Sequence, residues 1–262
     1  MQKMSIDELR QEELRVLIIV DKFCREHKLR YSLAHGSLLG AVRHRGFIPW
    51  DDDIDIVMPR RDYECFRSKF TINKGANVDL FHYELKKNYP YPFMKVASTI
   101  SYIDEKNLRD KYKQCCFGAY VDIFPMDYIK DMSIFDNKLK LFKKINFLIF
   151  KRKPTHAISR WLQPQIEYVK RKIYPSLLSL LRQMDKEQCY KENQYVGVDV
   201  WDYNKKELVP KTIWNNLIEY TFEGQKFLGF QDDIYLRALY GDYMKLPPME
   251  DRKPHFMDAY WL

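Results

Sequence analysis

Four aspartates in the first quarter of the chain have a spacing suited to metal chemistry. Residues 51–56 read Asp-Asp-Asp-Ile-Asp-Ile, and this alternation predicts a strand on which Asp53 and Asp55 project to the same side. Asp51 joins them if the strand begins early, whereas Asp52 points away. Carboxylates on one face repel unless a cation lies between them, and such oxygen ligands suit Mg²⁺ or Mn²⁺. The pattern therefore predicts a divalent-metal site.

A Gly-Ser pair upstream supplies the complementary half of such a site. Gly36 and Ser37 precede a predicted short helix, where glycine lets backbone N–H groups approach a phosphate and serine adds a hydroxyl. The alternative is that the aspartates form a solvated acidic loop. The aliphatic alternation and the neighbouring Pro49 and Trp50 argue against that alternative.

These motifs resemble the nucleotidyltransferase superfamily, whose signature is Gly-Ser, a gap, Asp-hydrophobic-Asp and a third carboxylate on a later strand. The third carboxylate here is Asp122, within Tyr-Val-Asp-Ile-Phe. The long gap between Ser37 and Asp53 resembles the LicD/fukutin-related branch. The runs that carry this closer resemblance are 36–56, 121–127, 222–227 and 240–248.

The resemblance implies a metal-dependent enzyme that moves a phospho-alcohol from a CDP-activated donor to a glycan hydroxyl and releases CMP. In bacterial members the alcohol is typically choline, and the acceptor is teichoic acid or lipopolysaccharide; in animal members the alcohol is ribitol. The length of the chain resembles the bacterial type. Asp53 and Asp55 would hold the metal, and Asp122 would bind a second metal or act as general base.

Further residues are expected at the substrate, each with a structural alternative. Arg43, His44 and Arg45 lie between the two motifs and would clamp phosphates, unless they form a solvated basic loop. Trp50 would stack on the base or on the cationic head of choline, unless it packs under the loop. Asp127 would reach a metal or a ribose. The resemblance adds three positions near the C-terminus: Tyr240, Asp242 and Lys253.

The 262 residues predict an α/β (α+β) fold: a nucleotidyltransferase-like small mixed sheet flanked by helices, in a single domain over 1–262. Residues 137–192 match the family least and read as a variable, mainly helical basic insertion. The expected helices are 6–29, which begins with a Ser5–Glu8 capping box, 38–42, 62–70 and 232–239. The expected strands are 31–35, 54–58 and 120–128, the last ended by Pro125, and a hairpin is expected over 221–230.

The net charge of +8 is concentrated in one segment, because residues 137–186 contain 13 Lys or Arg and only 2 Asp or Glu. Such a segment can contact anionic lipid, bind an anionic glycan acceptor, or remain a solvated helical face. A lipid-linked glycan acceptor favours the first, so we expect peripheral contact with an anionic membrane and no nucleic-acid partner.

Five cysteines without a Cys-x-x-Cys motif argue against a disulfide framework and a Cys-based zinc site. Together with the polar N-terminal run Met1–Glu8, they favour a cytoplasmic protein that sits on the inner face of the membrane. Two other functions stay open. One is a nucleotidyltransferase that uses ATP or CTP with the same carboxylates. The other is a non-catalytic basic module that binds membrane or nucleic acid.

Overall fold

The structure is a computed structural model. It describes residues 1–70, 75–87, 89–104, 117–129, 132–149, 194–200, 207–252 and 258–262, and six single residues between 165 and 183. Within those residues, no helix has both the length and the apolar character that a membrane span requires.

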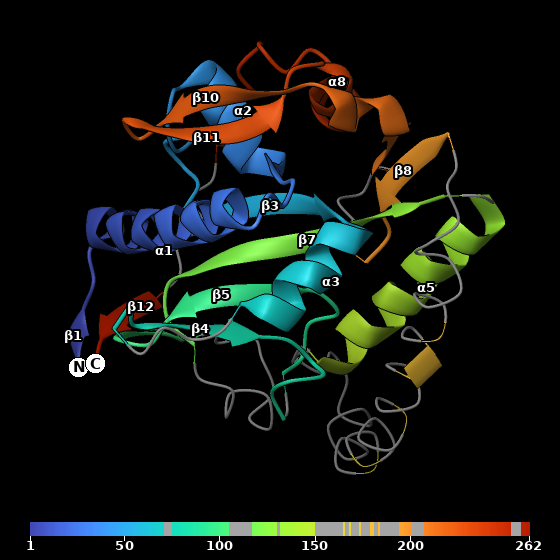
Figure 1. Cartoon of the computed structure of the whole chain (residues 1–262). Coiled ribbons are helices and arrows are strands. Elements are labelled where there is room, and N and C mark those ends of the chain that lie inside the picture. Colours follow the sequence, from blue (N-terminus) through green and yellow to red (C-terminus); the bar gives the residue numbers. More distant parts are fainter. Residues whose placement is uncertain are drawn as a thin grey trace.

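A seven-stranded mixed sheet forms the centre of the molecule (Figure 1). The parallel strands β3 (Ile54–Pro59) and β7 (Tyr120–Tyr128) lie side by side, and every other pairing is antiparallel. This arrangement confirms the expected small mixed sheet. The remaining strands are β2 (Ser32–Leu33), β5 (Met94–Ser98), β4 (Val78–Phe81), β8 (Tyr195–Val198) and β9 (Glu207–Pro210).

Two helices, α1 (Ile6–Glu26) and α3 (Arg60–Lys69), pack on the sheet (Figure 1). The predicted capping box of α1 is confirmed, since Ser5 and Glu8 bond to each other's backbone N–H groups. The apolar stripe of α1 is buried. These helices shield one end of the sheet from water and bring the first turns of α1 near the start of β3.

A second layer is formed by α2 (His35–Arg43), α8 (Ile234–Tyr240) and the hairpin of β10 (Leu217–Phe222) and β11 (Gln225–Phe230). The expected hairpin is confirmed: Glu223 and Gly224 both have positive φ, as a tight two-residue turn requires. The short helices η1 (Lys211–Asn215) and η2 (Met249–Asp251) flank this layer in sequence.

The two chain ends meet in a small antiparallel sheet. In it β12 (Asp258–Trp261) lies between β1 (Gln2–Lys3) and β6 (Ser101–Asp104). The sequence patterns predict none of these three strands, because none is longer than four residues. They do not predict β4, β5, β8 or β9 either.

Two expectations are corrected. Pro125 does not end β7, which continues to Tyr128: β5 pairs only as far as Ile123 and β8 begins at Asp127, so Pro125 lies where no antiparallel partner needs its missing N–H. The third helix begins at Arg60 rather than 62. The helical expectation for 137–192 is confirmed over its first part, which belongs to α5 (Met132–Ile149). Most of the rest, up to 192, lies outside the described residues.

Candidate functional site

Asp55 and Asp122 lie directly opposite each other on the parallel strands β3 and β7. Lys95 on β5 is the register partner of Asp122, so the three side chains form one row across the sheet. The Lys95 ammonium donates to Asp122 Oδ1 at 2.5 Å, and only 8% of Asp122 is exposed. The structure therefore brings Asp122 beside Asp55, as we expect from the sequence.

Lys95 is itself buried, with 2% of its surface exposed. Aromatic faces surround its Nζ and stabilise a cation that has left water. The distances to the ring centroids are 3.4 Å for Tyr120, 4.7 Å for Tyr91, 5.5 Å for Phe93 and 5.6 Å for Phe117. The cage and Asp122 together fix the position of the Lys95 ammonium.

His35 fixes Asp55 from the other side. Its Nδ1 lies 3.2 Å from Asp55 Oδ2, and its Nε2 lies 2.9 Å from Glu207 Oε1, which also accepts a hydrogen bond from Tyr235 Oη. Burial disfavours the imidazolium, but Glu207 and Asp55 outweigh burial and raise the pKa of His35. A charged His35 between two carboxylates orients Asp55 and Glu207 at once.

Gly36 and Ser37 lie in the first turn of α2, because the helix begins at His35. Ser37 Oγ accepts a hydrogen bond from the backbone N–H of Asp55 at 2.8 Å and so fastens the helix to β3. A Cβ at Gly36 would lie 2.3 Å from Asp51 Oδ2, so only glycine lets the Asp51 carboxylate approach the helix start.

The loop that carries Asp51 is held by Arg10 of α1. The guanidinium donates to the carbonyl oxygens of Ile48, Pro49 and Asp51 at 3.1, 3.1 and 2.5 Å. These bonds satisfy backbone acceptors that have no strand partner. They keep the aspartate run in place before β3 begins.

At the start of β3, the acidic side chains outnumber the cationic side chains that face them. Glu13 of α1 is fully buried, and within the described part of the chain neither of its carboxylate oxygens has a hydrogen-bond partner. Burial, and then Asp52, Asp53, Asp122 and Asp51, raise the pKa of Glu13 well above its ordinary value. Asp53 keeps part of its surface exposed, yet desolvation, and then Asp55 and the other aspartates, raise its pKa as well.

Comparison with known proteins identifies the family of this chain. Residues 28–162 match the family model described as LicD/FKTN/FKRP, nucleotidyltransferase domain. The lipopolysaccharide cholinephosphotransferase LicD of Haemophilus influenzae is 32% identical over 97% of this chain and 98% of its own length. The chain belongs to the LicD family. Two uncharacterised Rickettsia proteins match in part: that of R. typhi is 30% identical over 47% of this chain and 35% of its own, and that of R. prowazekii 49% over 42% of each.

The donor set of this LicD-family site fits a divalent cation in chemistry and charge. The acidic side chains supply only oxygen donors, and the two buried oxygens of Glu13 have no hydrogen-bond partner in the described part of the chain. As the side chains stand, no group of three acidic, imidazole or thiol side chains among the described residues is close enough to hold a metal, with Asp55 turned to His35 and Asp122 to Lys95.

Several of the expected substrate residues gather near the loop before β3. Arg43 donates to the carbonyl oxygen of Tyr243 at 2.9 Å. Arg252 lies over the Trp50 ring at 5.4 Å, and His44 meets the same ring edge-on at 6.4 Å. Burial, followed by Arg43, lowers the pKa of His44 and keeps it neutral. Basic and aromatic groups therefore border the carboxylates of the family motif.

The structure does not bring Asp127 to this site. It is fully buried and forms a bidentate ion pair with Arg60, at 2.7 and 2.6 Å. Of the other expected residues, Arg45 is exposed with positive φ, Asp242 is exposed, Tyr240 lies at the end of α8, and Lys253 lies outside the described residues.

Sequence reasoning missed Glu13, Lys95 and His35. Glu13 lies on the apolar stripe of α1, four residues after Leu9 and three before Val16, and a charge on such a stripe is a detectable signal. Lys95 is likewise the lone charge in the run Tyr91–Ala97. Nothing in the local sequence marks His35, whose partner Glu207 is 172 residues away.

Proposed function

We propose that this protein transfers phosphocholine from CDP-choline to a hydroxyl of lipopolysaccharide or a related surface glycan, with release of CMP. The observation that carries the proposal is the row of Asp55, Asp122 and Lys95 across three strands, with the under-neutralised Asp53 beside it. Similarity to the Haemophilus enzyme over almost the whole chain supports the choice of alcohol and acceptor.

The residues that would hold Mg²⁺ or Mn²⁺ are Asp53, Asp55 and Asp122, with Asp51 and Glu13 beside them. A bound divalent ion would offset the charge that develops on the diphosphate of the donor. The excess of carboxylates over cations supports this assignment, because it would be relieved by such an ion.

The remaining residues position the carboxylates. Lys95 holds Asp122 through Oδ1, and His35 holds Asp55 through Oδ2, so both carboxylates are fixed in place across the two strands. Ser37 anchors the backbone of Asp55. Arg43 and Arg252, at the rim, carry charge suited to phosphate oxygens. Such preorganised charges lower the barrier because they need no rearrangement during the reaction.

The test is CMP release from CDP-choline in the presence of lipopolysaccharide, with and without Mg²⁺ or Mn²⁺. We expect metal-dependent release that falls at least about 100-fold in Asp53→Asn. Asp7→Asn, the same change at an exposed position on α1, is the matched control and should keep full activity. Teichoic acid and CDP-ribitol in parallel reactions identify the acceptor class and the alcohol.

Two outcomes would replace the proposal. Turnover of CTP or ATP, with no use of any CDP-alcohol, would indicate a nucleotidyltransferase built on the same carboxylates. No turnover of any donor, together with unchanged membrane or nucleic-acid binding in Asp53→Asn, would indicate a non-catalytic binding module.

We further propose that the basic segment 137–186 contacts anionic lipid on the cytoplasmic face of the membrane. In its described part, Lys140, Lys143 and Lys144 are exposed on α5. Cosedimentation with vesicles that contain phosphatidylglycerol tests this: binding should fall as salt rises, and should be weaker when these three lysines are replaced by Gln.

A further inference from the structure

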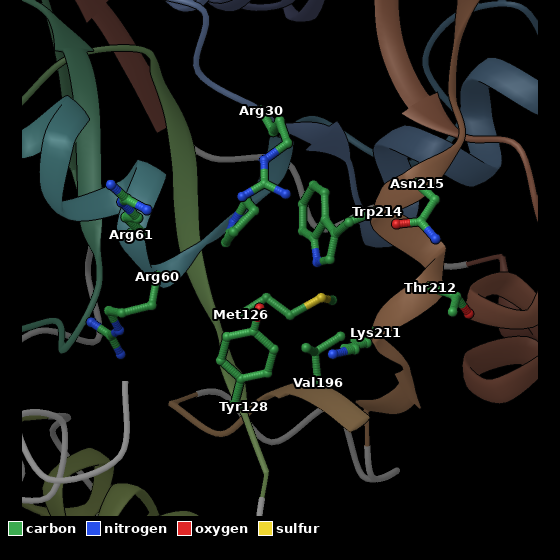
Figure 2. A pocket seen from close by; sticks show the side chains of 11 residues that line it. Arg30, Arg60, Arg61, Met126, Tyr128, Val196, Lys211, Thr212, Trp214 and Asn215 are labelled. Atoms are coloured by element: carbon green, nitrogen blue, oxygen red, sulfur yellow. The ribbon is translucent and has the colours of Figure 1, made fainter. Parts of the chain in front are cut away.

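A cavity of about 400 Å³ opens at the far end of β3 and β7 from the carboxylates (Figure 2). We call it the distal pocket. Residues from five parts of the chain line it: Arg30, the start of α3, the end of β7, Val196 of β8, and η1 with Lys211, Trp214 and Asn215. Nothing in the proposed transfer reaction uses these residues.

The distal pocket is separate from the carboxylate row. Pro59 and Met126, which line it, are register partners four residues beyond Asp55 and Asp122. At a rise of about 3.3 Å per residue, the two sites lie about 13 Å apart along the strands. A ligand in the distal pocket therefore does not have to touch the carboxylates.

The described residues that line the distal pocket are basic in balance and include no carboxylate. Arg30, Arg61 and Lys211 all border the space, and Figure 2 shows the Arg30 guanidinium directed toward its centre. Arg30 uses Nε for Asp62 at 2.8 Å, which leaves the other guanidinium N–H groups for a ligand. This lining attracts anions.

The start of α3 adds to that attraction. Pro59, Arg60 and Arg61 form the cap and first turn of this ten-residue helix, and no side chain caps it. The N–H groups at a helix start and the helix dipole both favour a negative group placed there.

Trp214 supplies the independent observation. It is 8% exposed, and its buried indole N–H has no hydrogen-bond partner among the residues that the structure describes. Figure 2 shows the indole nitrogen directed into the distal pocket, toward the space between Met126 and Lys211. A buried donor without a partner is costly, so its presence here indicates an acceptor that completes the site.

We propose that the distal pocket binds a phosphate group, carried on a small polar molecule such as a sugar. Arg30, Arg61 and Lys211 would supply charge, the start of α3 would supply backbone N–H groups, and Trp214 would donate from its indole. The volume exceeds that of a bare phosphate and leaves room for the attached molecule. This site does not depend on the proposed transfer reaction.

The test is the indole N–H resonance of Trp214 in ¹⁵N-labelled full-length protein, assigned with Trp214→Phe. We expect glucose 6-phosphate to shift this resonance saturably, and glucose to leave it in place. Affinity should fall about tenfold in Arg61→Gln and in Lys211→Gln, as expected for the loss of one charged hydrogen bond. Lys226→Gln, on the hairpin, is the matched control.

Inorganic phosphate in a parallel titration identifies the source of the group: weaker binding than glucose 6-phosphate indicates a carried phosphate, and equal binding indicates free phosphate. Absence of a saturable shift, or a shift of equal affinity in both charge variants, would overturn the proposal. Asp53→Asn should bind glucose 6-phosphate with the affinity of the unaltered protein. Its binding and its transfer activity are measured separately, so a failure of the distal-pocket proposal can be told from a failure of the proposed transfer reaction.

Discussion

Strand β7 carries two buried aspartates, Asp122 and Asp127. Cations match the carboxylates around Asp127, whereas carboxylates outnumber cations around Asp122. The two aspartates are five residues apart, so their side chains project to opposite faces of the sheet. Asp127 faces Arg60 of α3 and Lys138 of α5. Asp122 faces Lys95, but it also lies beside Asp55 and near further carboxylates.

At Asp127 the charges are balanced. Arg60 binds it through two nitrogens, and Lys138 lies 3.2 Å from it and 2.7 Å from the buried Asp199. Burial alone would raise the pKa of Asp127, but Arg60 and Lys138 reverse this and hold it well below its ordinary value. This cluster is complete without any ligand.

At Asp122 the balance is not reached. Lys95 and His35 supply the buried cations that the structure places against Asp122 and Asp55, while Asp53 and Glu13 are left with raised pKa values. Surplus negative charge of this kind lowers stability, and it is expected where a ligand completes the site. The comparison separates a structural aspartate, Asp127, from Asp122, to which we assign a function in the proposed reaction.

Replacement of the structural aspartate should have the largest effect on stability. Asp127→Asn would leave Arg60 and Lys138 buried without their counter-ion, and we expect a loss of about 3–5 kcal/mol in the free energy of unfolding. Urea denaturation measures it, with Asp7→Asn as control. A loss below about 1 kcal/mol would show that Asp127 is not the centre of a structural cluster.

Removal of the cation that faces Asp122 should have the next largest effect. Lys95→Met places Asp122 beside Asp55 with no buried ammonium, and we expect a loss of about 3 kcal/mol at pH 8. The double variant Lys95→Met with Asp122→Asn should recover part of it. No recovery in the double variant would mean that Lys95 stabilises through its aromatic cage and not through the charge of Asp122.

Divalent cations should stabilise the protein through the carboxylate end alone. Mg²⁺ or Mn²⁺ at about 100 times the dissociation constant should add about 2.7 kcal/mol, seen as a higher Tm in a thermal melt. The increase should disappear in Asp53→Asn and persist in Asp127→Asn. An equal increase in the Tm of Asp53→Asn would show that the cation binds elsewhere than at the aspartates of residues 51–55.

The sequence predicted the residues whose partners are local and missed those whose partners are distant. Alternation along β3 identifies Asp53 and Asp55 because a strand's two faces are fixed by the backbone. Lys95 could not be assigned in this way, since its role depends on β5 pairing with β7 rather than with β3. The same holds for Asp127, whose cations come from α3 and α5 and are not evident from the sequence around it.

Glu12 and Glu13 repeat the comparison on a smaller scale, as adjacent buried carboxylates on α1. Glu12 bonds to Arg15 through both oxygens, at 2.8 and 2.6 Å, and accepts a hydrogen bond from Ser98. Glu13 has no partner among the described residues. Its raised pKa means that the folded protein keeps a proton that the unfolded chain releases.

Stability should therefore fall as the pH rises from the ordinary Glu value of 4.5 toward the raised pKa of Glu13, by about 1.4 kcal/mol for each pH unit in that interval. Glu13→Gln removes this cost, so without divalent cations it should unfold at a higher temperature than the unaltered protein at pH 8, and at nearly the same temperature at pH 4. Glu12→Gln is the matched control and should lower stability at pH 8, because it leaves Arg15 without its counter-ion. A lower Tm in Glu13→Gln at pH 8 would show that the ionised Glu13 is neutralised after all, and that the surplus of charge at this end of β7 is smaller than the comparison with Asp127 indicates.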